Sequence, residues 1–273
     1  MTEEEKEKKK PQLALARARA VAVLDKRSPR ARGDEKTKKV LEWLYRWGWA
    51  SPSTVEKIGG AKRAGLVARL EKNGLVITTR TASGGGVKDI PAYLVTLSKS
   101  GLEEQEKNTN ELLPYDLDPY KIRQDHLRHD QLAQSSTLNA LIKKSIIGYQ
   151  TEKELAQKSM EGVKQPDILW ILPDGRKCAI EIELTAKWKR DLDQFVYPSI
   201  LSIQKTKDKP ARFDQIFIVS DSPRIIERYK AAFAPGSIIS IWEKDNTRHW
   251  KEKGKIEVQN WVKEKIQWKL LKS

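Results

Sequence analysis

The segment 166–187 most constrains the fold of this chain, because it reads as two β-strands joined by a tight turn. Apolar residues alternate along both arms with the period of two that a strand requires. Between the arms lies Pro173-Asp174-Gly175. Proline and aspartate suit the two right-handed positions of a type I turn, and glycine suits the left-handed position that follows. This loop predicts a hairpin in which Asp167 pairs with Glu181.

Three carboxylates share one face of the predicted hairpin, and the opposite face is apolar and expected to be core. Glu183 lies two residues beyond Glu181, about 6–7 Å away at the usual rise of a strand. One interpretation is a solvated strand face, where acidic residues are common. The other is a site for Mg²⁺ or Mn²⁺, because carboxylates this close repel one another without a cation between them. The metal ligands are then Asp167, Glu181 and Glu183, and Lys187 supplies a nearby positive charge.

The charge of the chain indicates the kind of partner it binds. Its 273 residues carry a formal charge of +15, and the pI is near 9.7. Such a positive charge points to a polyanion, nucleic acid before membrane. No apolar run reaches the length of a membrane-spanning helix, and the first residues lack the apolar core of a signal peptide. The one cysteine, Cys178, excludes a disulfide within the chain, so we expect a cytoplasmic protein.

Residues 34–102 are predicted to form a domain of three helices followed by two strands. The expected elements are helices near 37–47, from 53 and over 61–73, and strands over 75–81 and 92–97. This order resembles winged helix-turn-helix DNA-binding domains, in which the third helix enters the major groove and the loop between the strands forms the wing. A merely solvated basic face and a protein-binding winged helix are the alternatives. The expected DNA-contacting residues are Lys62, Arg63, Arg69, Lys72, Arg80 and Lys88.

The rest of the chain is expected to hold an arm, a linker and an α/β domain. Residues 1–33 read as a basic, poorly ordered arm, and residues 103–120 as a linker. Residues 121–273 read in the order helix, hairpin, helix, strand, helix, strand and closing helix. The expected elements include helices over 129–147 and 192–203, strands over 215–220 and 237–242, and a helix from Pro223. This order predicts a mixed sheet flanked by helices on both faces.

The hairpin resembles the motif of the PD-(D/E)xK nucleases, the restriction-endonuclease-like family. That motif has Pro-Asp on one strand and Glu-x-Lys on the next, and Pro166-Asp167 and Glu181-Ile182-Glu183 stand in those places. Glu183 departs from the motif because it occupies the lysine position. Lys187 or Lys189 would then supply the positive charge, or the site would be inactive.

Over residues 35–240 the chain resembles the MobC-type relaxases and their replication-relaxation relatives. The resemblance rests on the winged helix, on Leu127-Arg128-His129-Asp130, on Glu181-x-Glu183-x-Thr185 and on Tyr197. It implies a protein that binds a transfer origin in double-stranded DNA and nicks one strand with Mg²⁺ or Mn²⁺. Single-stranded DNA after nicking, and other mobilisation or conjugation proteins, are the further partners it implies.

The same resemblance implies roles for individual residues. His129 and Asp130 would complete the metal site from the first helix of the α/β domain, and Lys187 would stabilise phosphate charge. Tyr197 would be a further site residue, and the sequence leaves open whether Tyr197 or water attacks the phosphate. Two other functions stay open as well: a DNA-binding regulator or replication accessory protein without catalysis, and a restriction-type nuclease that cuts both strands.

Overall fold

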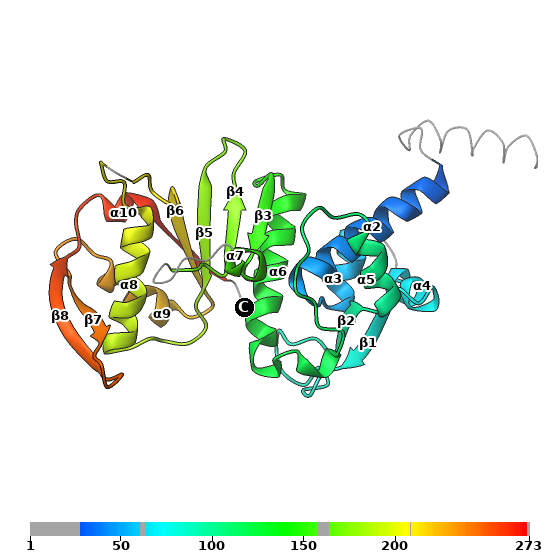
Figure 1. Ribbon diagram of the computed structural model, residues 1–273, viewed down its shortest axis with the longest axis horizontal. Coiled ribbons are helices and arrows are strands. Elements are labelled where there is room, and N and C mark those ends of the chain that lie inside the picture. The colour runs from blue at the N-terminus through cyan, green and yellow to red at the C-terminus, as the bar shows by residue number, and fades with distance from the viewer. Residues whose placement is uncertain (1–27, 61–63, 158–163, 208, 272–273) are drawn as a thin grey trace, which may run out of the picture.

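The computed structural model describes residues 28–60, 64–157, 164–207 and 209–271. Within these residues the protein is a mixed α/β structure whose N-terminal and C-terminal halves lie side by side along its long axis (Figure 1). The N-terminal half has a two-stranded sheet, and the C-terminal half has a five-stranded and a second two-stranded sheet. The α/β class predicted from the sequence is therefore confirmed. None of the helices in the described residues combines the length and apolar character needed to cross a membrane.

The N-terminal half contains helices and strands in the order expected from the sequence. They are α2 (Pro29–Trp47), α3 (Pro52–Ile58), α4 (Leu66–Lys72), β1 (Val76–Arg80), β2 (Tyr93–Leu97) and α5 (Lys99–Glu106). Helix α2 begins inside the segment expected to be an arm, since the Ser28 hydroxyl accepts a hydrogen bond from the amide of Ala31. Helix α5 covers the first residues of the segment expected to be a linker. Residues 1–27, Lys62 and Arg63 lie outside the described residues.

Two caps determine where α3 and α4 begin. Ser51 caps α3, two residues before the position from which the sequence predicted this helix, because its hydroxyl accepts the amide N–H of Thr54 at 3.2 Å. The carboxylate of Glu56 accepts the three amide N–H groups of residues 65–67 at 2.8 to 3.2 Å. A residue of α3 therefore caps the N-terminus of α4 and fixes the two helices to each other.

The five-stranded sheet organises the C-terminal half. Its strands are β3 (Gly148–Thr151), β4 (Ile168–Ile171), β5 (Lys177–Ile182), β6 (Gln215–Ser220) and β9 (Ile266–Leu270), in the spatial order β3-β4-β5-β6-β9. The pairs β3–β4 and β4–β5 are antiparallel, and β5–β6 and β6–β9 are parallel. Ile168 pairs with Ile180, and Gly175 has a φ of 83°. Both observations confirm the predicted hairpin, since one more step along this register sets Asp167 opposite Glu181.

Helices and a second hairpin complete the C-terminal half. They are η1 (Pro119–Lys121), η2 (Gln124–His126), α6 (Leu127–Ile142), α7 (Glu152–Ala156), α8 (Lys189–Ile203), α9 (Pro223–Ala232), β7 (Ile238–Lys244), β8 (Trp250–Glu257) and α10 (Val262–Lys265). The helix predicted to close the chain is wrong beyond residue 265. Ile266 is buried and residues 266–270 pair with β6, so the alternation of a strand overrides the helical spacing of the apolar residues.

Both faces of the sheet are covered. Ile168, Cys178 and Ile180 face a cluster that includes residues of α6, whereas Leu169 and Ala179 face a cluster that includes residues of α8 and α9. The first cluster also contains residues of α2 and β2, so the two halves share one hydrophobic core. Asp167 and Glu181 alternate with Ile168 and Ile180, so the acidic residues lie on the face of Leu169 and Ala179. That face is largely buried, which contradicts the interpretation of a solvated strand face.

Helix α6 joins the halves, since it packs on α3 and on β5. Its Gln134 is fully buried and links two tryptophans of the N-terminal half. The amide oxygen of Gln134 accepts Nε1–H of Trp43 at 3.0 Å, and its amide nitrogen donates to the carbonyl oxygen of Trp49 at 2.9 Å. Arg46 adds an ion pair with Glu154 at 2.9 Å. These polar links hold the halves in one arrangement.

Candidate functional site

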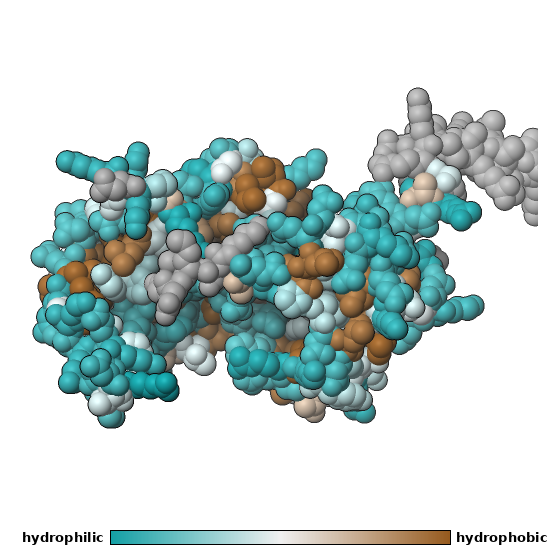
Figure 2. All heavy atoms as spheres, viewed as in Figure 1, coloured by the Kyte–Doolittle hydropathy of each residue, from teal (hydrophilic) through white to brown (hydrophobic). Residues whose placement is uncertain are grey.

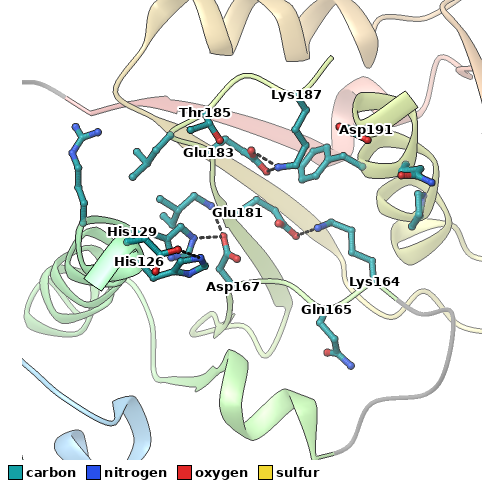
Figure 3. Close-up of a pocket in the computed structure, with 17 residues that line it drawn as sticks. His126, His129, Lys164, Gln165, Asp167, Glu181, Glu183, Thr185, Lys187 and Asp191 are labelled. Carbon is teal, nitrogen blue, oxygen red and sulfur yellow. Dashed lines mark hydrogen bonds and ion pairs between the residues drawn. The ribbon is translucent and has the colours of Figure 1, made fainter. Parts of the chain in front are cut away.

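A cleft of about 960 Å³ lies where β5 ends and where α6 and α8 begin. These ends meet at the lower edge of the molecule as drawn in Figure 1, and Figure 2 shows a notch in that edge. Asp167, Glu181 and Glu183 all line the cleft, and Figure 3 shows their side chains around it. The structure thus brings together the three acids that the sequence placed on one hairpin face.

Asp167 lies between the sheet and α6. One carboxylate oxygen, Oδ2, accepts the amide N–H of Ile182 at 2.6 Å and lies 3.2 Å from Nε2 of His129. The other ring nitrogen of His129, Nδ1, lies 3.1 Å from Oδ1 of Asp130. Asp130 in turn accepts Nε1–H of Trp49 at 3.3 Å. Asp130 therefore orients the imidazole, and His129 is the residue of this pair that lines the cleft.

Glu181 and Glu183 are each paired with a lysine. Glu181 is only 3% exposed, and its Oε1 lies 2.8 Å from Nζ of Lys164. Glu183 is 5% exposed, bonds Nζ of Lys187 through both oxygens and accepts the hydroxyl of Tyr229 at 2.8 Å. The predicted proximity of Lys187 to the acids is thus found in the structure.

Lys164 is a charged cleft residue that the sequence did not single out. It precedes the Pro-Asp pair by two residues, in a segment with no periodic pattern. The ring of Phe195 lies near both lysines, with its centroid 4.5 Å from Nζ of Lys164 and 4.8 Å from Nζ of Lys187. A cation–π contact of this kind favours an ammonium group at each position. Only the folding of α8 across the sheet places Phe195 there.

The protonation of these groups follows from burial and from their neighbours. Burial opposes ionisation of Asp167, but His129, the amide of Ile182 and Lys164 outweigh it and lower the pKa of Asp167. Burial also opposes a charge on His129, yet Asp130 and Asp167 raise the pKa of His129 to about 10. For Glu181, burial dominates over the attraction of Lys164 and raises its pKa to about 8. Near neutral pH, Asp167 is therefore ionised and Glu181 is largely protonated.

The donor groups of the cleft suit a divalent cation. Carboxylate oxygens are the ligands that Mg²⁺ and Mn²⁺ prefer, and Mn²⁺ also accepts an imidazole nitrogen. Lys164 and Lys187 each bond a carboxylate that the metal would need, so a bound cation must share or displace these ammonium groups. A tighter grouping in the described part of the chain is His126, His129 and Asp130, whose potential ligand atoms lie within 4.8 Å of one another.

The remaining predicted site residues lie outside the cleft lining. Tyr197 is half-buried on α8 and packs against the apolar cluster beneath that helix. Arg69 and Lys72 are exposed on α4, Arg80 is exposed on β1, and Lys88 is exposed in the loop between β1 and β2. These four basic side chains form an exposed set in the N-terminal half, separate from the acidic cleft.

Comparisons of the chain with protein-family models, with curated proteins and with solved structures found no match.

Proposed function

We propose that this protein is a metal-dependent DNA strand-nicking enzyme of plasmid or integrative-element mobilisation. The observation that carries the proposal is the convergence of Asp167, Glu181 and Glu183 on one cleft beside His129. Strongly perturbed pKa values in a cleft are typical of functional sites. Three carboxylates in a largely buried setting are costly unless a ligand or a charge partner makes use of them.

The architecture supports this proposal. The order α6-β3-α7-β4-β5-α8-β6, with an antiparallel β4–β5 hairpin and a parallel β6, resembles the core of PD-(D/E)xK nucleases. In the N-terminal half, three helices followed by a hairpin resemble a winged helix, with α4 in the place of the DNA-reading helix. The exposed basic residues of α4 and of the wing would neutralise DNA phosphates.

The cleft residues fit hydrolysis of a phosphodiester. A bound Mg²⁺ or Mn²⁺ would neutralise charge on the scissile phosphate and lower the pKa of a coordinated water. The three carboxylates would hold this ion, with Nε2 of His129 beside them. Lys164 and Lys187 would donate to phosphate oxygens, whose negative charge grows in the transition state. Tyr197 does not line the cleft, so water would be the nucleophile.

One observation favours a second candidate, a DNA-binding protein without catalysis. Glu183 stands where the nuclease motif has lysine, and both buried glutamates are already paired with ammonium groups. Such pairing could stabilise a fold that has lost its metal. The two candidates differ in whether any divalent cation binds at the cleft.

A plasmid assay tests the proposal. Supercoiled plasmid that carries the DNA neighbouring the protein's own gene is incubated with the full chain and Mn²⁺ or Mg²⁺. We expect open circles from the wild type and none from Glu181→Gln, whereas Glu227→Gln, at an exposed position, should nick like the wild type. Linear product would favour a restriction-type nuclease. The absence of cleavage with either metal would favour the non-catalytic candidate.

A further inference from the structure

Trp188 is an exposed indole ring at the edge of the cleft. It precedes α8, directly after the cleft residue Lys187, and 61% of its surface is accessible. The guanidinium of Arg228, from α9, stacks on the ring. A stacked arginine at an exposed site stabilises the fold only weakly, so packing alone gives little reason for this ring to lie in water.

A second tryptophan with basic neighbours lies at the same end of α8. Trp250, the first residue of β8, is 37% exposed. The guanidinium of Arg190 lies 5.7 Å from the centroid of its ring, and Nζ of Lys244 lies 5.0 Å from it. Arg190 follows Trp188 by two residues on α8. The start of α8 thus links the two exposed rings, and a cationic side chain lies against each ring.

This combination has a recognisable chemistry. Unpaired bases stack on exposed aromatic rings, while neighbouring arginines and lysines attract the phosphates between them. A base pair inside a duplex offers no free face to such a ring. Binding of a protein surface or of a lipid headgroup would not require two exposed aromatic rings that each lie beside an arginine or lysine side chain. The charge and the aromatic faces together fit a single strand.

We propose that Trp188 and Trp250, with Arg228 and Arg190, form a stacking surface for single-stranded DNA that continues into the cleft past Lys187. The choice of DNA rests on the proposed function, since the strand next to the scissile phosphate must be unpaired to reach such rings. The surface itself needs no metal. It holds bases, and the acidic cleft holds the phosphate.

Binding of a labelled oligothymidylate of about 16 nucleotides, followed by fluorescence anisotropy with the full chain in EDTA, tests the surface. We expect Trp188→Ala to weaken binding by about 5- to 100-fold, the range for one lost base stack. Trp188→Phe should restore most of the affinity because it keeps an aromatic face. Arg228→Ala should also weaken binding, whereas Lys230→Ala, on the same helix and with the same charge, should not.

An abasic oligonucleotide of equal length separates stacking from charge. The wild type should bind it more weakly than oligothymidylate, Trp188→Ala should narrow this difference, and the Trp188→Ala, Trp250→Ala double variant should bind both alike. Equal wild-type affinity for the two oligonucleotides, or unchanged affinity in a Trp188→Ala, Trp250→Ala double variant that circular dichroism shows to be folded, would overturn the surface. RNA that binds more tightly than DNA would overturn the choice of DNA.

These measurements do not depend on cleavage. If the wild type never nicks plasmid but binds single strands through Trp188, the proposed function fails and the surface stands. If it nicks and the double variant binds single strands normally, the surface fails and the proposed function stands.

Discussion

Asp167, Glu181 and Glu183 each have a cationic neighbour. The pKa of Asp167 and the pKa of Glu181 nevertheless shift in opposite directions. Asp167 stays ionised because His129 and an amide N–H oppose the effect of burial, whereas Glu181 retains its proton to higher pH because burial outweighs Lys164. A metal would reverse this balance for Glu181, since a divalent charge favours the carboxylate. The protonation state of Glu181 therefore indicates whether a metal ion is bound in the cleft.

Glu181 should make stability depend on pH in the absence of metal. Its pKa is about 8 in the folded protein and near 4.5 as an ordinary glutamate. Between these values the folded state binds a proton that the unfolded chain releases, so the contribution of Glu181 to the free energy of unfolding should fall as pH rises towards about 8 and stay constant above it. The raised pKa of His129 adds a fall of the same sign that extends to about pH 10. Glu181→Gln should make the profile less steep between about pH 4.5 and 8, whereas Glu227→Gln should keep the wild-type slope. Urea unfolding in EDTA measures both; a Glu181→Gln profile as steep as the wild type would contradict the prediction.

Binding of Mn²⁺ should displace the proton of Glu181. Near pH 7 we expect release of about one proton per ion, and the affinity should rise by up to about tenfold per pH unit until about pH 8. Near pH 9 this release should vanish, because Glu181 is then ionised before the metal arrives. Calorimetry in two buffers with different ionisation enthalpies counts the protons. The same count at both pH values would rule out Glu181 as the group that titrates.

At the scale of single elements, short contacts between neighbouring segments position the functional surfaces. The β4–β5 hairpin aligns two acids through its register, and the contact between α3 and α4 sets the orientation of the exposed basic helix. Helix α4 has only seven residues, and a helix this short is marginal on its own. The carboxylate of Glu56, which accepts three of its N-terminal amides, supplies the missing stabilisation.

Glu56→Ala should therefore weaken DNA binding although it removes a negative charge. Loss of the cap should cost about 1 kcal/mol of stability and loosen α4. Glu56→Gln keeps an acceptor oxygen and should retain most of the stability. As a control, Glu103→Ala removes the same charge from an exposed position on α5 and should leave DNA affinity equal or slightly higher. Anisotropy with duplex DNA compares the three variants; tighter binding by Glu56→Ala would show that charge outweighs the cap.

At the scale of the whole molecule, helix α6 couples the N-terminal half to the cleft. A line of hydrogen bonds runs from Trp49 through Asp130 and His129 to Asp167. The same helix buries Gln134 against two tryptophans, and the apolar cluster around it extends through both halves. Shared burial of this kind predicts that the halves unfold together.

Gln134→Leu should test this coupling. It leaves Nε1–H of Trp43 and the carbonyl of Trp49 without partners in a buried setting, which should cost about 2 kcal/mol or more. Because the core is shared, calorimetry should show one transition in the wild type and one transition at lower temperature in the variant. Gln157→Leu, which removes a hydrogen bond at an exposed position, should have little effect. Two separate transitions in the wild type would contradict a shared core.

The sequence by itself determined the α/β class, the β4–β5 register and the three acids on one face, because alternation and turn chemistry act between residues close in the chain. It did not identify β9, since residues 266–270 become a strand through pairing with β6, about fifty residues earlier. Tertiary structure alone decided that the acidic face is buried, that Lys164 reaches Glu181, and that Tyr197 lies outside the cleft. Each of these depends on where α6 and α8 pack, and packing joins residues whose separation in the chain no local pattern records.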